Sequence, residues 1–72
     1  MGSLEYYRCQ KEGSEKNWYA KNDRGDKFEI GKKAYVDSPP HRKKVIVVEK
    51  LTQASDIPKR KTIHWLYPKA KA

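Results

Sequence analysis

Positive charge and aromatic rings are the two chemical features that stand out in this sequence. Lysine and arginine side chains contact phosphate oxygens and hold a polyanion without reading its base sequence. Two short basic clusters each directly precede a segment with the pattern of a strand. We expect both clusters to contact phosphates; they comprise Arg42, Lys43 and Lys44, and then Lys59, Arg60 and Lys61.

The last strand-like segment, residues 61–67, carries Trp65 and Tyr67 two positions apart, which places both rings on one face. An exposed ring beside basic residues can stack on a base, with a contribution of ~1–3 kcal/mol per base. A buried ring belongs to the core instead. We expect Trp18, Tyr35 and Tyr67 in the core, whereas the pattern leaves Trp65 open between core and surface.

Adjacent strand residues point to opposite faces, so Tyr6 and Tyr7 cannot both face inward, and neither can Trp18 and Tyr19. At least one ring of each pair is therefore expected at the surface. The candidate nucleic-acid-binding set consists of the six cations together with Trp65 or Tyr19 as the ring that stacks on a base or sugar.

The sequence contains no arrangement typical of an active site. His41 and His64 have no serine or cysteine motif that would place a nucleophile beside them. The phosphate-loop patterns GxxxxGK[ST] and GxGxxG do not occur. Cys9 is expected to be a small core or edge residue, and two isolated histidines add little toward a metal site. We expect no catalysis, no metal, no cofactor and no small-molecule substrate.

The net charge is +8 at pH 7, and it is unevenly distributed along the chain. Residues 1–36 carry +2 and residues 37–72 carry +6. This excess predicts an anionic partner for the second half, attracted by the field of the protein and bound with release of counterions. The alternative is solubility, because a small domain commonly carries a net charge of ~2–8 for that reason alone.

Alternating or β-branched segments predict short strands along the whole chain, at 5–9, 18–21, 27–30, 33–36, 44–51 and 61–67. About five such strands predict an all-β fold, a small SH3-like five-stranded barrel or a strongly bent antiparallel sheet, with an OB-type barrel as the second choice. The continuous Val/Ile run in 44–51 predicts a strand covered on both faces.

Turn residues predict how the strands connect. Segments 18–21 and 27–30 flank a turn around Gly25, which predicts a β-hairpin. Arg24-Gly25-Asp26 spells a tripeptide read by integrins, but it is ordinary turn material. Asp37-Ser38-Pro39-Pro40 predicts a loop. If 44–51 and 61–67 pair antiparallel, the two basic clusters lie at opposite ends of that ladder and flank the sheet, unless the loops fold back.

A chain of 72 residues makes one domain at most, and it buries only ~60% of its unfolded surface, so its core must be thin. We expect the domain at 4–68, an expression-tag remnant or disordered start at 1–3, and a basic disordered tail at 69–72. The single cysteine favours a reducing intracellular setting, which is nuclear if the source is eukaryotic. The longest apolar run, 45–48, is far short of the ~20 residues of a membrane span, so no membrane partner is expected.

Residues 28–68 resemble the opening of a bromo-adjacent homology (BAH) domain, a chromatin-reading module. The likeness lies in the stretches FEIGKKAYV, VIVVEKL and IHWLYP. The resemblance implies an all-β core and attachment to nucleosomes, histone tails or other chromatin proteins. Trp65 matches the cage aromatic of that family, and Lys44 stands near the position of a second one.

These observations together predict a non-catalytic, monomeric domain that binds nucleic acid, DNA rather than RNA, or chromatin. One alternative is a protein-interaction module that binds a peptide or a histone tail. The other is a basic subunit that docks on a larger complex.

Overall fold

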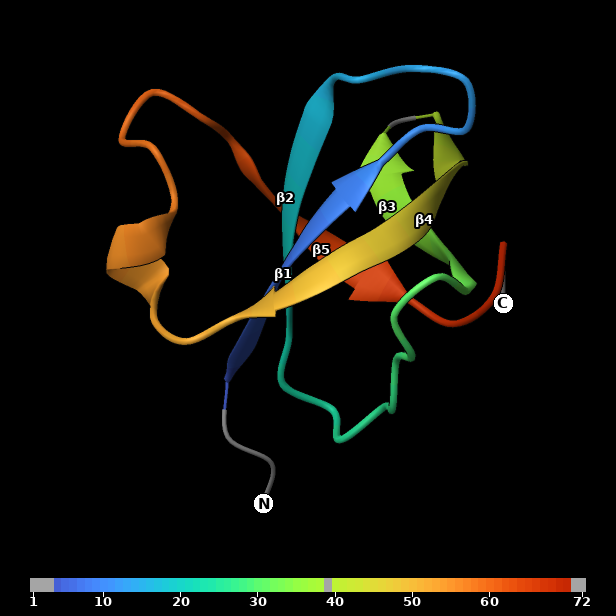
Figure 1. Cartoon of the computed structure of the whole chain (residues 1–72). Coiled ribbons are helices and arrows are strands. Elements are labelled where there is room, and N and C mark those ends of the chain that lie inside the picture. The colour runs from blue at the N-terminus through green and yellow to red at the C-terminus, as the bar shows by residue number, and fades with distance from the viewer. Residues whose placement is uncertain (1–3, 39, 71–72) are drawn as a thin grey trace.

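The computed structural model describes residues 4–38 and 40–70, and it contains five strands and one short helical turn. The strands close into a barrel in the order β1-β2-β5-β3-β4 (Figure 1). The prediction of a small all-β, SH3-like five-stranded barrel is therefore confirmed. The elements are β1 (Glu5–Gln10), β2 (Asn17–Asn22), β3 (Lys33–Ser38), β4 (His41–Leu51), the 3-10 turn η1 (Ala54–Asp56) and β5 (Ile63–Tyr67).

Four of the five strand pairs are antiparallel. β1 pairs with β2 on one side and with β4 on the other, and its register with β4 shifts between Arg8 and Cys9. β3 pairs with β4 and with β5. The remaining pair, β2 with β5, is parallel and begins at Tyr19 and Ile63. The last strand therefore lies between β2 and β3, which are consecutive in the chain but do not pair with each other, and it closes the barrel.

The core is small and lies inside the barrel, as the chain length predicts. Side chains alternate between the inside and the outside along each strand. Trp18 and Phe28 are partly buried and pack against the core, whereas Cys9 is completely buried within it, as expected. The buried members of the cluster are Tyr7, Cys9, Ala20, Ala34, Val36, Val45, Val47 and Leu66.

The final strand faces the opposite way from the prediction. Leu66 is fully buried and pairs with the buried Val36, so Trp65 and Tyr67 lie on the outer face, half-buried. Tyr35 pairs with Tyr67 and is also on the outside. The core assignment of Tyr35 and Tyr67 is wrong, because Val36 and Leu66 occupy the inward positions.

The apolar run of β4 is covered fully on one face only. Val45 and Val47 are buried, whereas Ile46 and Val48 are half-buried. The expectation of a strand buried on both faces is therefore wrong for the outer face. β4 also begins at His41, three residues earlier than the β-branched run suggests, and its first residue pairs with Ser38 at the end of β3. Asp37 and Ser38 of the expected loop therefore belong to β3, and residue 39 lies outside the described residues.

The hairpin predicted around Gly25 does not form. β2 pairs with β1 and β5, and residues 27–30 are not a strand. The ring of Phe28 instead packs edge-on against that of Tyr7, with the centroids 5.3 Å apart. The backbone N–H of Gly31 donates to the carbonyl of Val47 at 2.8 Å. These contacts hold residues 27–31 against β1 and β4. The segment therefore cannot pair with β2 as the second strand of a hairpin.

The expected boundaries of the domain are only partly described. The barrel occupies residues within the predicted span of 4–68. The expected tag or disordered start at 1–3 lies outside the described residues, and so do residues 71 and 72 of the expected tail. Lys69 is described, and its carbonyl accepts a hydrogen bond of 3.2 Å from the Arg42 guanidinium.

Candidate nucleic-acid interface

Three strands of the barrel start at the same end, and this brings the basic clusters together. β4 and β5 are each antiparallel to β3, so they run in the same direction, and β2 is parallel to β5. In Figure 1 these three starts lie toward the top of the barrel. The clusters were expected at opposite ends only if β4 and β5 paired antiparallel, and this condition is not met because β3 lies between them.

We call this part of the molecule the basic end and define it as residues 11–16, 37–38, 40–44 and 59–64. It contains eight Lys and Arg residues against three Asp and Glu residues, a formal charge of +5. The segment at the opposite end, residues 23–33, comprises the loop after β2 and the first residue of β3, and it carries four Lys and Arg residues against three Asp and Glu residues, or +1. Most of the net charge of the described chain is therefore concentrated at one end of the barrel.

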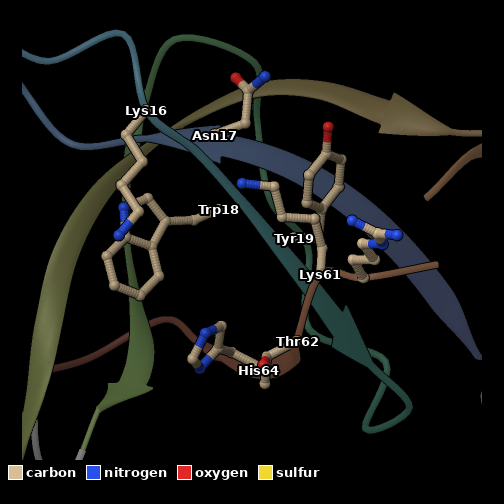
Figure 2. A pocket seen from close by; sticks show the side chains of 8 residues that line it. Lys16, Asn17, Trp18, Tyr19, Lys61, Thr62 and His64 are labelled. Atoms are coloured by element: carbon tan, nitrogen blue, oxygen red, sulfur yellow. The ribbon is translucent and has the colours of Figure 1, made fainter. Parts of the chain in front are cut away.

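The basic end contains a cavity of about 220 Å³ between the start of β2 and the approach to β5. Figure 2 shows the Lys16 chain alongside the indole of Trp18, with Tyr19 and Lys61 across from them and His64 below. None of the described residues that line the cavity carries a carboxylate. They are Lys16, Asn17, Trp18, Tyr19, Arg60, Lys61, Thr62 and His64.

Trp18 is the residue around which the basic end is organised. It shares the inward face of the barrel with its pair partner Cys9 and packs against the core. The ammonium groups of Lys16 and Lys43 lie 5.0 and 4.8 Å from the centroid of its ring. The His64 ring lies 5.1 Å away, and the buried indole N–H has no hydrogen-bond partner among the described residues. Cation–π attraction thus holds two lysines beside the cavity.

His64 has a defined tautomer because of its neighbour on β3. Its Nδ1 lies 2.9 Å from the backbone carbonyl oxygen of Asp37, which can only accept, so Nδ1 carries the proton. In the neutral ring Nε2 is then an acceptor. The Asp37 carboxylate accepts the backbone N–H of Trp65 at 2.8 Å and lies 3.5 Å from the same Nδ1. The acid nearest to His64 is thus engaged within the barrel.

Three of the six predicted cations meet at the cavity. Arg60 and Lys61 line it, and Lys43 reaches the Trp18 ring at its side. Within residues 4–38 and 40–70, the ion pairs of lysine and arginine involve Arg8, Arg24 and Lys50. The cations at the cavity are therefore not neutralised by carboxylates of the described chain.

The other three predicted cations lie nearby but outside the cavity. Lys44 is exposed on the outer face opposite Tyr35, and Lys59 is exposed in the segment before β5. Arg42 is half-buried, and its guanidinium stacks on Tyr67 at 3.6 Å from the ring centroid. The Arg42 guanidinium therefore packs on the outer face of the barrel, although its backbone belongs to the basic end.

The prediction of an exposed Tyr19 is wrong. Tyr19 does point away from the barrel interior, because its neighbour Ala20 is fully buried inside. Only 8% of its surface is exposed, however, and its pair partner is Ile63 at the end of the segment between η1 and β5. Arg60 and Lys61 of that segment line the same cavity as Tyr19. Although the Tyr19 side chain points outward, it is therefore not accessible to solvent and cannot stack on a base.

Trp65 lies on the outer face of β5 and not in the core. It is half-buried, and the Lys21 ammonium lies 4.6 Å from the centroid of its ring. It does not line the cavity at the basic end. Of the two rings predicted to stack on nucleic acid, Tyr19 is thus buried, and Trp65 is already covered by the Lys21 ammonium.

Sequence reasoning missed Lys16 and assigned Trp18 to the core alone. The signal was present, because residues two apart in an extended segment share a face and Lys16 precedes Trp18 by two. No feature of the sequence indicates that Thr62 and Asn17 belong to the site. They line the cavity because β2 and β5 pair in parallel, and periodicity does not reveal strand partners.

The Arg24-Gly25-Asp26 turn is closed on itself. Arg24 donates from Nε to the Asp26 carboxylate at 3.2 Å and from Nη2 to the Leu66 carbonyl. Its guanidinium also lies 4.5 Å from the centroid of the Tyr67 ring. These contacts engage the arginine within the fold, as expected of turn material.

Two further features concern reactivity. Burial raises the pKa of the Cys9 thiol to about 12, so it remains protonated at physiological pH. Within the described residues, no group of three His, Cys, Asp or Glu side chains is placed to hold a metal ion. The described part of the chain also contains no helix long and apolar enough to cross a membrane.

Comparisons with protein-family models, with curated proteins and with solved structures found no match to this chain.

Proposed function

We propose that this domain binds nucleic acid, duplex DNA foremost, through its basic end. The observation that carries the proposal is the convergence of segments 11–16, 40–44 and 59–64 at one end of the barrel, around a cavity whose described lining has no carboxylate. A concentrated positive field attracts a polyanion, and binding releases the counterions condensed on it.

Phosphate contacts supply most of the binding in this mechanism. Lys16, Lys59, Arg60 and Lys61 are exposed, so each can approach a phosphate without rearrangement of the barrel. Lys43 is held beside the Trp18 ring and faces the same end. Contacts of this kind position a nucleic acid but carry no base specificity. We therefore expect little dependence on base sequence.

The protein-interaction alternative has less support in the fold. Every strand of the closed barrel has a neighbour on each side, so a peptide has no free edge to which it can add a strand. The cage suggested by the BAH resemblance would use Trp65, whose ring is already covered by the Lys21 ammonium at 4.6 Å. Methyl-lysine binding at Trp65 would require Lys21 to move away.

A salt titration tests the proposal. With about six phosphate contacts, the logarithm of the duplex DNA affinity should fall against the logarithm of salt concentration with a slope near −5, at about 0.9 per contact. Amide resonances of residues 11–16, 41–44 and 59–64 should shift on addition of DNA. A flat salt response, or shifts centred on an aromatic groove with peptide and none with DNA, would reject nucleic acid as the partner.

A further inference from the structure

The cavity at the basic end has the chemistry of a phosphate site and the dimensions of a small one. Lys16, Arg60 and Lys61 contribute charge-assisted donors, and Thr62 and Asn17 add a hydroxyl and an amide. Its volume of about 220 Å³ is below the ~300–1,000 Å³ typical of pockets for drug-sized ligands. A phosphate with part of its sugar suits this space better than a complete nucleotide cofactor.

The size of the cavity favours the end of a strand over a continuous backbone. Its lining comes from two adjacent segments, residues 16–19 at the start of β2 and residues 60–62 and 64 at the start of β5. A terminal phosphate brings a nucleotide on one side only, whereas an internal phosphodiester brings nucleotides on both sides into the same small space.

Charge distinguishes a terminal phosphate from an internal one. A phosphomonoester carries about −1.5 to −2 at pH 7 and has three free oxygens, as a phosphorylated side chain does. An internal phosphodiester carries one charge. The three cations of the cavity are unpaired by described carboxylates, so the group with the larger charge gains more from them.

We propose that this cavity binds the terminal phosphate of a nucleic-acid strand, with Arg60, Lys61 and Lys16 as the residues that contact it. The inference rests on the proposed nucleic-acid binding and adds preference for a phosphorylated end. Lys43 and Lys59 flank the cavity and contact the phosphodiesters that follow. The Trp18 indole forms the wall of the site and does not stack on a base, because two lysines already lie beside its ring.

The experiment compares short single-stranded oligothymidylates with a 5′-phosphate, a 3′-phosphate or neither, at one salt concentration. A hydroxyl-ended strand that is two nucleotides longer adds two phosphodiester charges and so controls for the charge of the terminal phosphate. We expect at least one phosphorylated strand to bind about tenfold more tightly than both unphosphorylated strands, which corresponds to about 1.4 kcal/mol. Because the chain has two tryptophans, Trp65→Phe leaves Trp18 as the single fluorescent reporter, and its emission should change on binding.

A pair of matched variants locates the effect. Arg60→Gln combined with Lys61→Gln should abolish the preference for a phosphorylated end. Lys32→Gln combined with Lys33→Gln removes the same charge from exposed residues at the opposite end of the barrel and should preserve the preference.

Each other outcome overturns a defined part of the inference. Equal affinity for all strands overturns the terminal-phosphate site and leaves nucleic-acid binding intact. A preference that survives in the Arg60/Lys61 variant, or binding without a change in Trp18 emission, places the site elsewhere. Tighter binding of a phosphoserine peptide assigns the cavity to a phosphoprotein instead. Failure of every strand to bind overturns the terminal-phosphate site, and the salt titration with duplex DNA then decides the proposed function separately.

Discussion

At the scale of single residues, burial decides which side chains are available for chemistry. Cys9 is completely buried, and this raises the pKa of its thiol from 9.0 to about 12. The unfolded thiol ionises near pH 9, so above that pH the unfolded state loses its proton while the folded state retains it. The free energy of unfolding therefore decreases from about pH 9 toward pH 12, where the folded thiol also ionises.

This linkage gives a prediction for Cys9→Ala. Between pH 8 and pH 10.5, the wild type should lose about 2 kcal/mol more stability than the variant, at ~1.36 kcal/mol per pH unit above the unfolded pKa. Urea unfolding at the two pH values measures the difference. Tyr7, whose pKa is raised chiefly by burial, is retained in both proteins, so most of its contribution cancels; the charge of Cys9 is the smallest cause of that rise. Identical losses would show that the Cys9 thiol ionises equally in both states.

The same scale explains why aromatic rings were hard to place from sequence. Tyr19 faces outward and is nevertheless buried, whereas Tyr67 faces outward and lies between the guanidinium groups of Arg24 and Arg42. Alternation predicts the direction of a side chain but not what covers it. Covering segments come from elsewhere in the chain, so the exposure of a ring depends on the tertiary fold.

At the scale of elements, Asn22 joins the end of β2 to its neighbours. It is completely buried, and its Nδ2 donates to the Leu66 carbonyl of β5 at 3.1 Å and to the Asp26 carboxylate at 3.0 Å. Its Oδ1 accepts the backbone N–H of Arg24 at 3.1 Å. The side chain thus fastens the following turn and β5 to β2.

Asn22→Ala should therefore lower the free energy of unfolding by about 2–3 kcal/mol, because it leaves these partner groups without their hydrogen bonds. Chemical denaturation measures the loss. Asn17→Ala is the matched control at the other end of β2. Its side chain is half-exposed, and water can replace its bonds to Arg8 and Gln10, so a loss below about 1 kcal/mol is expected. Equal losses would show that burial of Asn22 adds nothing.

The elements themselves were largely predictable, but their partners were not. The segments near 5–9, 18–21, 33–36, 44–51 and 61–67 are strands, and the barrel class follows from their number and length. Pairing is a long-range property, and the parallel contact of β2 with β5 leaves no local pattern. Segment 27–30 failed as a strand because Phe28 packs on Tyr7 and Gly31 bonds to β4. The six predicted cations were visible in the sequence, whereas the meeting of Lys43, Arg60 and Lys61 at one cavity was not.

At the scale of the whole molecule, the position of the charge matters more than its amount. The basic end carries +5 and residues 23–33 carry +1, although both regions are rich in lysine. Long-range attraction depends on the total charge, but counterion release depends on the cations that reach phosphates. These two contributions can be separated by removing equal charge from the two ends of the barrel.

Two triple variants make this separation. Replacing Lys16, Lys43 and Lys61 with glutamine removes three cations from the basic end, and replacing Lys27, Lys32 and Lys33 removes three from the opposite end. Each variant lowers the formal charge from +8 to +5. The first should make the salt slope for duplex DNA less negative by about 2.7, whereas the second should change it by less than about 1. If both variants change the salt slope equally, DNA binding depends only on the total charge of the protein, and the basic end is not the interface.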